Sequence, residues 1–143
     1  MVVLNSAQQQ LLGSWKLEHS ENFDEYMKEI GIGAIKRALG NSTTPVVTIS
    51  VNEDVWTVQV QSTFKNDEWK FKLNEKFKQK TIDGREFWCV VTLSDDGRIV
   101  ETQENIEGNN DVPSVITRFV EGGKLVAESQ ANNVKATRLY VRI

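Results

Sequence analysis

The hydrophobic residues of this chain recur with two different periods. Within residues 22–39, apolar side chains follow the i, i+3, i+4, i+7 spacing that forms one stripe along a helix. These side chains are Phe23, Tyr26, Met27 and Ile30. The segment is therefore predicted to be helical, with the stripe packed against the core.

Glycines divide this helical segment into two parts. The break at Gly31-Ile32-Gly33 predicts the end of a first helix, for which Asn22 or Ser20 is expected to be the N-cap. A second short helix is predicted from Ala34 to Leu39, stopping at Gly40. The result is a helix-turn-helix pair.

The rest of the chain consists of short β-rich runs separated by turn residues that tolerate a positive φ. Ten strands in hairpin order predict a mainly β, antiparallel up-and-down barrel or sandwich, and a barrel that closes on itself would leave no edge. Neither parity of 55–62 is purely apolar, and both parities of 86–93 carry large apolar residues. A dry sandwich core should sort more cleanly, and a barrel whose lumen accepts polar groups and water is compatible with this mixture. The predicted strands are Trp15–His19, Val46–Val51, Val55–Ser62, Trp69–Leu73, Phe77–Ile82, Glu86–Leu93, Ile99–Gln103, Ser114–Val120, Leu125–Ser129 and Val134–Val141.

Composition narrows the function classes. The 143 residues predict one domain spanning 1–143. A net charge of -3 argues against a nucleic-acid partner bound through a basic face. With Cys89 and His19 as the only cysteine and histidine, neither a disulfide nor a cysteine-based zinc site can form, and no metal or cofactor is expected. The amino terminus lacks a basic n-region and no apolar run is long enough to span a membrane, so a soluble protein in a reducing compartment is expected.

Four ordered segments resemble the intracellular fatty-acid-binding proteins, which are calycin-type β-barrels. The amino-terminal segment is Gly13–Lys28, followed by Ile30-Gly-Ile-Gly33. The others are Ser62–Asn66 with Phe71–Leu73, Thr117–Leu125, and Thr137–Tyr140. The resemblance runs in order over nearly the whole chain.

This resemblance implies a ten-stranded clam-shaped barrel, capped by the helix-turn-helix between the first and second strands, around a water-filled cavity. The family anchors a buried lipid carboxylate with two arginines and a tyrosine, which match Arg118, Arg138 and Tyr140. The chain departs from the family's commonest pattern by a longer stretch at 107–113, expected at a strand connection, and by extra amino-terminal residues. The family's portal side chains match Phe23, Tyr26, Met27, Ile32, Phe64, Ile82 and Asp83.

The hydrophobic alternation agrees with this anchor at only one of the two arginines. Arg118 shares its parity with apolar residues two positions away on either side, which favours an inward direction. In the last strand Leu139 and Val141 form the apolar set, so alternation alone would turn Arg138 and Tyr140 outward. The inward direction of this pair is implied by the resemblance.

The histidine, the cysteine and the basic residues of the helical segment give weaker indications of function. His19 shares parity with the apolar residues of its strand and is interpreted as structural, and Cys89 as a space-filling thiol. Lys28, Lys36 and Arg37 offer cations for a transient contact of the helical lid with an anionic membrane, or for import machinery that would take the protein into the nucleus. Because acidic residues are interspersed among them, we favour solvated helix faces.

The sequence therefore predicts a cytoplasmic, monomeric carrier. It would reversibly bind a long-chain fatty acid or a similar hydrophobic carboxylate, with the helix pair as a lid. The alternatives are a retinoic-acid-type carrier, which would use the same anchor, a lipid-modifying enzyme on the same barrel, and a protein-interaction module with a vestigial cavity. No nucleophile–base pair is readable, so we do not expect an enzyme.

Overall fold

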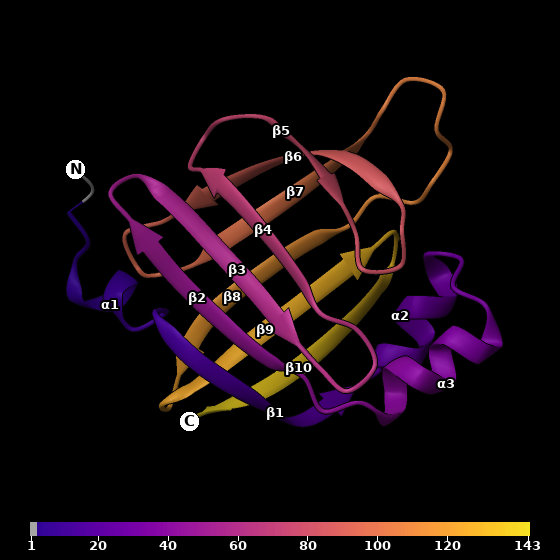
Figure 1. Cartoon of the computed structure of the whole chain (residues 1–143), viewed down its shortest axis with the longest axis horizontal. Helices are drawn as coiled ribbons and strands as arrows, with labels where there is room; N and C mark the ends of the chain where they lie inside the picture. The colour runs from indigo at the N-terminus through magenta and orange to yellow at the C-terminus, as the bar shows by residue number, and fades with distance from the viewer. Residues whose placement is uncertain (1–2) are drawn as a thin grey trace.

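Ten antiparallel strands form one strongly curved sheet, which the computed structural model describes over residues 3–143 (Figure 1). The strand order is β4-β3-β2-β1-β10-β9-β8-β7-β6-β5, so every neighbour except the β1–β10 pair is joined in sequence order. The strands are β1 (Gly13–Glu21), β2 (Val46–Asn52), β3 (Val55–Gln61), β4 (Asp67–Lys72), β5 (Phe77–Lys80), β6 (Glu86–Leu93), β7 (Ile99–Asn105), β8 (Val115–Glu121), β9 (Lys124–Ala131) and β10 (Val134–Arg142). All ten predicted strands are confirmed.

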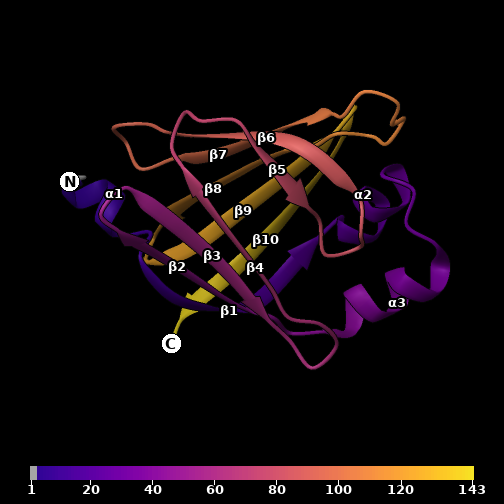
Figure 2. The same ribbon diagram turned by 45° about the horizontal axis from the view of Figure 1, so that its top comes forward.

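The predicted up-and-down barrel is confirmed, and at one place it is not closed by backbone pairing. Strands β4 and β5 are the two ends of the ladder and are not paired with each other in the described part of the chain (Figure 2). The rings of Phe71 on β4 and Phe77 on β5 stack at 5.6 Å between centroids, with an interplanar angle of 13°. Side-chain packing therefore takes the place of backbone hydrogen bonds at this seam.

The helix-turn-helix lies at one end of the barrel, between β1 and β2. Helix α2 (Phe23–Glu29) and helix α3 (Ala34–Ser42) are separated at the predicted glycine break. Helix α3 does not stop at Gly40 but continues to Ser42. A Cβ atom at Gly40 would lie 2.9 Å from Sδ of Met27, so glycine serves close packing between the two helices here.

Asn22 occupies the N-cap position of α2 without capping it through its side chain. Its φ of 61° is left-handed, and Nδ2 donates to the carbonyl oxygen of Lys135 at 2.9 Å. This bond attaches the start of the helix pair to the beginning of β10.

A short helix that the sequence did not predict, α1 (Ser6–Gln9), covers the opposite end of the barrel (Figure 1). Asn5 and Gln8 form a reciprocal capping box, and Nε2 of Gln8 donates to the carbonyl oxygen of Ser94 at 3.0 Å. Leu11 follows the helix and is fully buried in the barrel. The extra amino-terminal residues thus close this end of the molecule.

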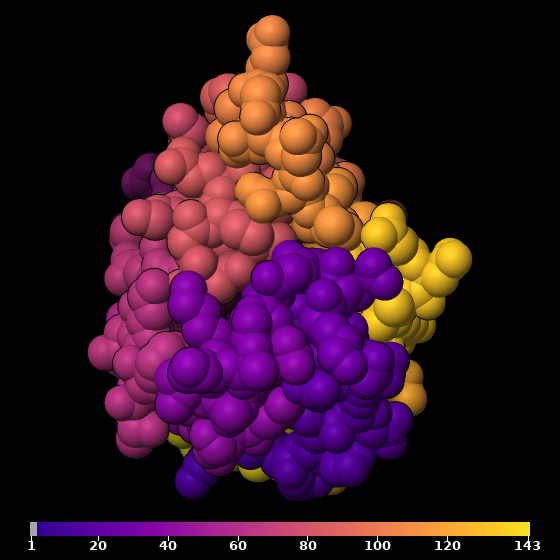
Figure 3. Space-filling model, turned by 90° about the vertical axis from the view of Figure 1, so that its right-hand side faces the viewer, coloured from indigo at the N-terminus to yellow at the C-terminus, as the bar shows by residue number. Residues whose placement is uncertain are grey.

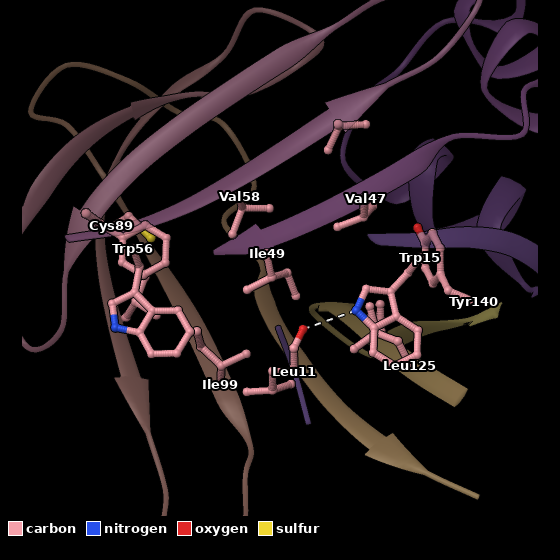
Figure 4. Packing of buried hydrophobic residues seen from close by; sticks show 14 residues of the cluster. Leu11, Trp15, Val47, Ile49, Trp56, Val58, Cys89, Ile99, Leu125 and Tyr140 are labelled. Atoms are coloured by element: carbon pink, nitrogen blue, oxygen red, sulfur yellow. Dashed lines mark hydrogen bonds between the residues drawn. The ribbon is translucent and has the colours of Figure 1, made fainter. Parts of the chain in front are cut away.

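The main hydrophobic core fills the α1 end of the barrel (Figure 4). Trp15 and Trp56 are both fully buried there, and Nε1 of Trp15 donates to the carbonyl oxygen of Leu11 at 3.1 Å. A second, smaller cluster packs the inner face of α2 against β9 and β10. This confirms the predicted role of the helical stripe in packing.

A β-bulge at Glu18 overturns the predicted direction of His19. Leu17 pairs with Tyr140, but His19 pairs with Leu139, so one residue of β1 is skipped between them. The bulge reverses the parity of the strand. His19 is therefore exposed, and Ser20 lies opposite Arg138.

None of the helices within residues 3–143 is both long enough and apolar enough to cross a bilayer.

Stability is expected to depend on the α1 end of the core. Leu11→Ala should lower the free energy of unfolding by about 2–5 kcal/mol, because it leaves a cavity among fully buried side chains. Chemical denaturation measures this change. Ile35→Ala is the control, since Ile35 is 81% exposed on α3; equal losses in the two variants would contradict the packing described.

Candidate functional site

A cavity of about 330 Å³ lies between the helix pair and the barrel walls, a volume typical of small-molecule sites. Strands from both sides of the barrel line it, together with α2 and α3. All ten site residues singled out in the sequence border this cavity: Phe23, Tyr26, Met27, Ile32, Phe64, Ile82, Asp83, Arg118, Arg138 and Tyr140.

The rim of the cavity is formed where the helix pair meets two turns of the barrel (Figure 3). Phe64 in the β3–β4 turn is 49% exposed, although apolar side chains usually avoid water. Its neighbour Lys65 donates from Nζ to the carbonyl oxygen of Ile82 at 2.5 Å, which joins the β3–β4 and β5–β6 turns. The rim is thus held together by a single long side chain at this point.

Asp83 is a structural element of the rim. It accepts from Nε of Arg85 at 2.6 Å and from the hydroxyl of Thr81 at 2.5 Å. Burial raises the pKa of Asp83, but these hydrogen bonds outweigh that effect, so its pKa lies below its usual range. Nη1 of Arg85 also donates to the carbonyl oxygen of Val112 at 3.3 Å, so this ion pair reaches the long β7–β8 connection.

The same connection is hydrogen-bonded to the lid. Residues 107–113 lie between β7 and β8, as predicted, and Ser114 at the end of this stretch meets Tyr26 of α2. The two hydroxyl oxygens are 2.6 Å apart, and Ser114 N donates to Oε1 of Gln103 at 2.8 Å. Burial raises the pKa of Tyr26, although the Ser114 bond acts against that rise. Tyr26 is therefore a neutral, buried link between lid and barrel.

Arg138 and Tyr140 both border the cavity from β10, as the resemblance implies and against the simple alternation of that strand. The Arg138 guanidinium lies 3.9 Å from the centroid of the Phe23 ring, and Nε donates to Oγ of Ser20 at 2.9 Å. Burial lowers the pKa of Arg138, while Tyr140 acts in the opposite direction. Within residues 3–143, Arg138 forms no salt bridge with a carboxylate.

Arg118 borders the cavity from β8 but has a partner. Nη1 donates to Oε1 of Glu101 on β7 at 2.9 Å, and Nε1 of Trp69 on β4 donates to the same oxygen at 3.2 Å. Glu101 is 1% exposed. Sequence reasoning missed this carboxylate, although Glu101 shares the inward parity of Ile99 and Gln103, both buried on the same strand.

The arrangement can hold an anionic head group beside apolar walls. One arginine carries a charge matched only by neutral groups, and an arginine fork can donate two parallel hydrogen bonds to a carboxylate. Cys89 is buried in the core cluster and His19 is exposed outside it. No group of three or more metal-ligating side chains occurs among residues 3–143.

Comparisons with known proteins find relatives of this chain in sequence and in fold. The profile described as the lipocalin / cytosolic fatty-acid binding protein family matches residues 12–143. Fatty acid-binding protein 5 of Pygoscelis papua is 43% identical over 129 residues, covering 90% of this chain and 93% of the relative. Fatty acid-binding protein homolog 6 of Caenorhabditis elegans is 42% identical over 134 residues, covering 94% of this chain and 98% of the relative.

Two solved structures have closely similar folds. The apo crystal structure of Caenorhabditis elegans lipid binding protein 8 superimposes with a TM-score of 0.90 at 36% identity, covering 99% of this chain and all of that one. A Schistosoma mansoni fatty acid binding protein in complex with arachidonic acid gives a TM-score of 0.89 at 35% identity, covering 96% of this chain and 99% of that one.

The Cys89 thiol is expected to be inert in the folded protein. Burial, together with the negative charge of Glu101, raises its pKa to about 12. Because the thiolate is the reactive form, an aromatic disulfide reagent should label Cys89 slowly at pH 7–9 and rapidly after denaturation. The absorbance of the released thiol measures both rates. Rapid labelling of the folded protein at pH 7 would contradict this burial.

Proposed function

Since the chain belongs to the lipocalin / cytosolic fatty-acid binding protein family, we propose that it is an intracellular carrier that reversibly binds a long-chain fatty acid, or a similar hydrophobic carboxylate, inside the barrel. The names of its relatives and the arachidonic acid complex of the Schistosoma mansoni protein support a fatty-acid ligand. The cytoplasm is the proposed location.

The observation that carries this proposal is the environment of Arg138. A guanidinium keeps its charge in a protein, so in a partly buried site it requires an anion, carbonyl groups or water. Its neighbours Ser20 and Phe23 are neutral. Tyr140, two residues further on the same face of β10, adds a hydroxyl that can donate to the same carboxylate. A fatty-acid head group fits this pair.

The acyl chain would supply most of the affinity. Burying one methylene group is worth about 0.8 kcal/mol, so a long chain gains on the order of 10 kcal/mol before the cost of ordering it. A charge-assisted hydrogen bond contributes roughly 1.5–3 kcal/mol. The apolar walls would therefore determine how tightly the lipid binds, and the charge at Arg138 would determine which head group is accepted.

We propose binding and release without chemistry, rather than an enzyme. Among residues 3–143 the cavity lining contains no cysteine or histidine to act as nucleophile or base. The carrier is proposed to act as a monomer, with no nucleic-acid partner. The membrane contact of the lid remains a weaker proposal, because Arg37 is paired with Asp24 at 3.2 Å.

Release of the ligand would require the lid to move. The hydrogen bond between Tyr26 and Ser114 and the contact of Lys65 with Ile82 both hold the rim together. Local opening at these contacts would let a chain pass between the helices and the barrel turns.

Head-group recognition is tested by Arg138→Gln. This variant should bind hexadecanoate roughly 10-fold or more weakly than the unaltered protein, because a charge-assisted pair is lost. The affinity for hexadecanol should change much less, since the alcohol carries no charge. Titration calorimetry measures both. Equal losses for acid and alcohol would reject the proposed anchor.

Mass spectrometry of lipids extracted from the purified protein distinguishes fatty acids from retinoids.

The lid is tested by Tyr26→Phe. Loss of the hydroxyl bond, worth about 1 kcal/mol, should speed ligand release by about 5-fold. Stopped-flow displacement of a bound fluorescent fatty acid measures the rate. Ser114→Ala is the matched partner, and the double variant should release ligand no faster than either single variant. Unchanged release in both single variants would count against the lid.

A further inference from the structure

The cavity contains a buried carboxylate that the head-group anchor does not need. Glu101 projects from β7, is 1% exposed and borders the cavity. Its Oε1 accepts from Arg118 at 2.9 Å and from Nε1 of Trp69 at 3.2 Å. These three side chains come from β7, β8 and β4, so the cluster spans the lumen of the barrel.

The Glu101 carboxylate neutralises one of the two arginines of the anchor. Arg118 is 11% exposed and lies within an ion pair, whereas the neighbours of Arg138 within residues 3–143 include the Ser20 hydroxyl, the Phe23 ring and Tyr140 but no paired carboxylate. The two cations are therefore not equivalent. A ligand carboxylate meets a free charge at Arg138 but a compensated charge at Arg118.

Only one of the two carboxylate oxygens of Glu101 accepts hydrogen bonds from the described protein groups. No protein group within residues 3–143 donates to Oε2 of Glu101. Negative charge on this oxygen is therefore shielded less than on Oε1, and an approaching anion is repelled in a medium of low dielectric constant. Binding a lipid acid directly at Arg118 would place two carboxylates on one guanidinium.

The other charged side chains that border the cavity include Lys36 and Asp67, whose opposite charges sum to zero, and three residues of the rim. Asp83 and Arg85 neutralise each other at the rim, where Lys65 also reaches a backbone carbonyl. The inner cluster of Glu101, Arg118 and Arg138 is left with one uncompensated positive charge.

We propose that Glu101 is a specificity-determining residue of this carrier. It holds Arg118 in an internal ion pair, directs the ligand's head group to Arg138 and Tyr140, and selects lipids with one negative charge over those with two. This inference rests on the proposed fatty-acid-binding function and deepens it, because it names the cation that binds the head group and the charge the pocket accepts.

Two variants of the internal pair test this inference. Glu101→Gln releases Arg118, so hexadecanoate should bind roughly 10-fold more tightly, and hexadecyl phosphate should gain still more because it carries additional charge. Hexadecanol affinity should change by less than about 3-fold. The double variant E101Q/R118Q removes the pair as a neutral unit, so its hexadecanoate affinity should stay within about 3-fold of the unaltered protein.

Controls separate charge from packing. Glu104→Gln makes the same chemical change on the exposed face of β7 and should leave all three affinities unchanged. Arg138→Gln should lose roughly 10-fold or more in hexadecanoate affinity. Thermal melting shows which variants fold. If the single variant Glu101→Gln does not fold, the double variant E101Q/R118Q gives the decisive comparison.

The outcomes distinguish this inference from the function on which it rests. If E101Q/R118Q loses as much hexadecanoate affinity as Arg138→Gln, then the head group binds Arg118 and the inference is overturned while the carrier function stands. The same holds if Glu101→Gln weakens acid and alcohol equally, because Glu101 would then act only in packing. Failure of the unaltered protein to bind any of the three lipids would overturn both.

Discussion

The permanent charge of arginine is the constraint around which this cavity is organised. A guanidinium inside a barrel cannot lose its proton, so each one must find a partner in the protein or in what the protein binds. Arg118 has the internal partner Glu101. Arg138 has only neutral neighbours. The two arginines therefore differ in their environments: Arg118 is compensated by a carboxylate, and Arg138 forms no salt bridge within residues 3–143.

The two ends of the barrel serve this arrangement in opposite ways. The α1 end is filled by a hydrophobic core that includes Trp15 and Trp56, and α1 itself covers it. The other end is covered by helices whose contacts with the barrel include single hydrogen bonds such as Tyr26 to Ser114. The first end holds the strands in register around the charged groups, and at the second end a smaller apolar cluster packs α2 against β9 and β10.

Most of the fold could be predicted from the sequence because turn residues mark every hairpin and the helical stripe is clear. The errors have local physical causes. The bulge at Glu18 inserts one residue without any hydrophobic signal, so His19 was assigned to the wrong face. Helix α1 has only four residues, too few to show a period. Gly40 was read as a helix end, but it is a point of close contact with Met27. The open seam between β4 and β5 leaves no trace in the spacing of strands.

The site was predictable only in part. Alternation indicated the direction of Arg118, and family resemblance was needed for Arg138, because a lumen that accepts polar groups does not sort residues by hydrophobicity. Glu101 stands at an inward position, but its pairing depends on how the long 107–113 connection sets β8 beside β7.

The α1 end of the barrel, which the hydrophobic core fills, has a practical consequence as well. Helix α1 and the carboxyl end of the chain both lie there, away from α2 and α3 (Figure 1). A dye, tag or surface tether attached after Ile143 would therefore leave the α2–α3 end of the barrel facing open solution.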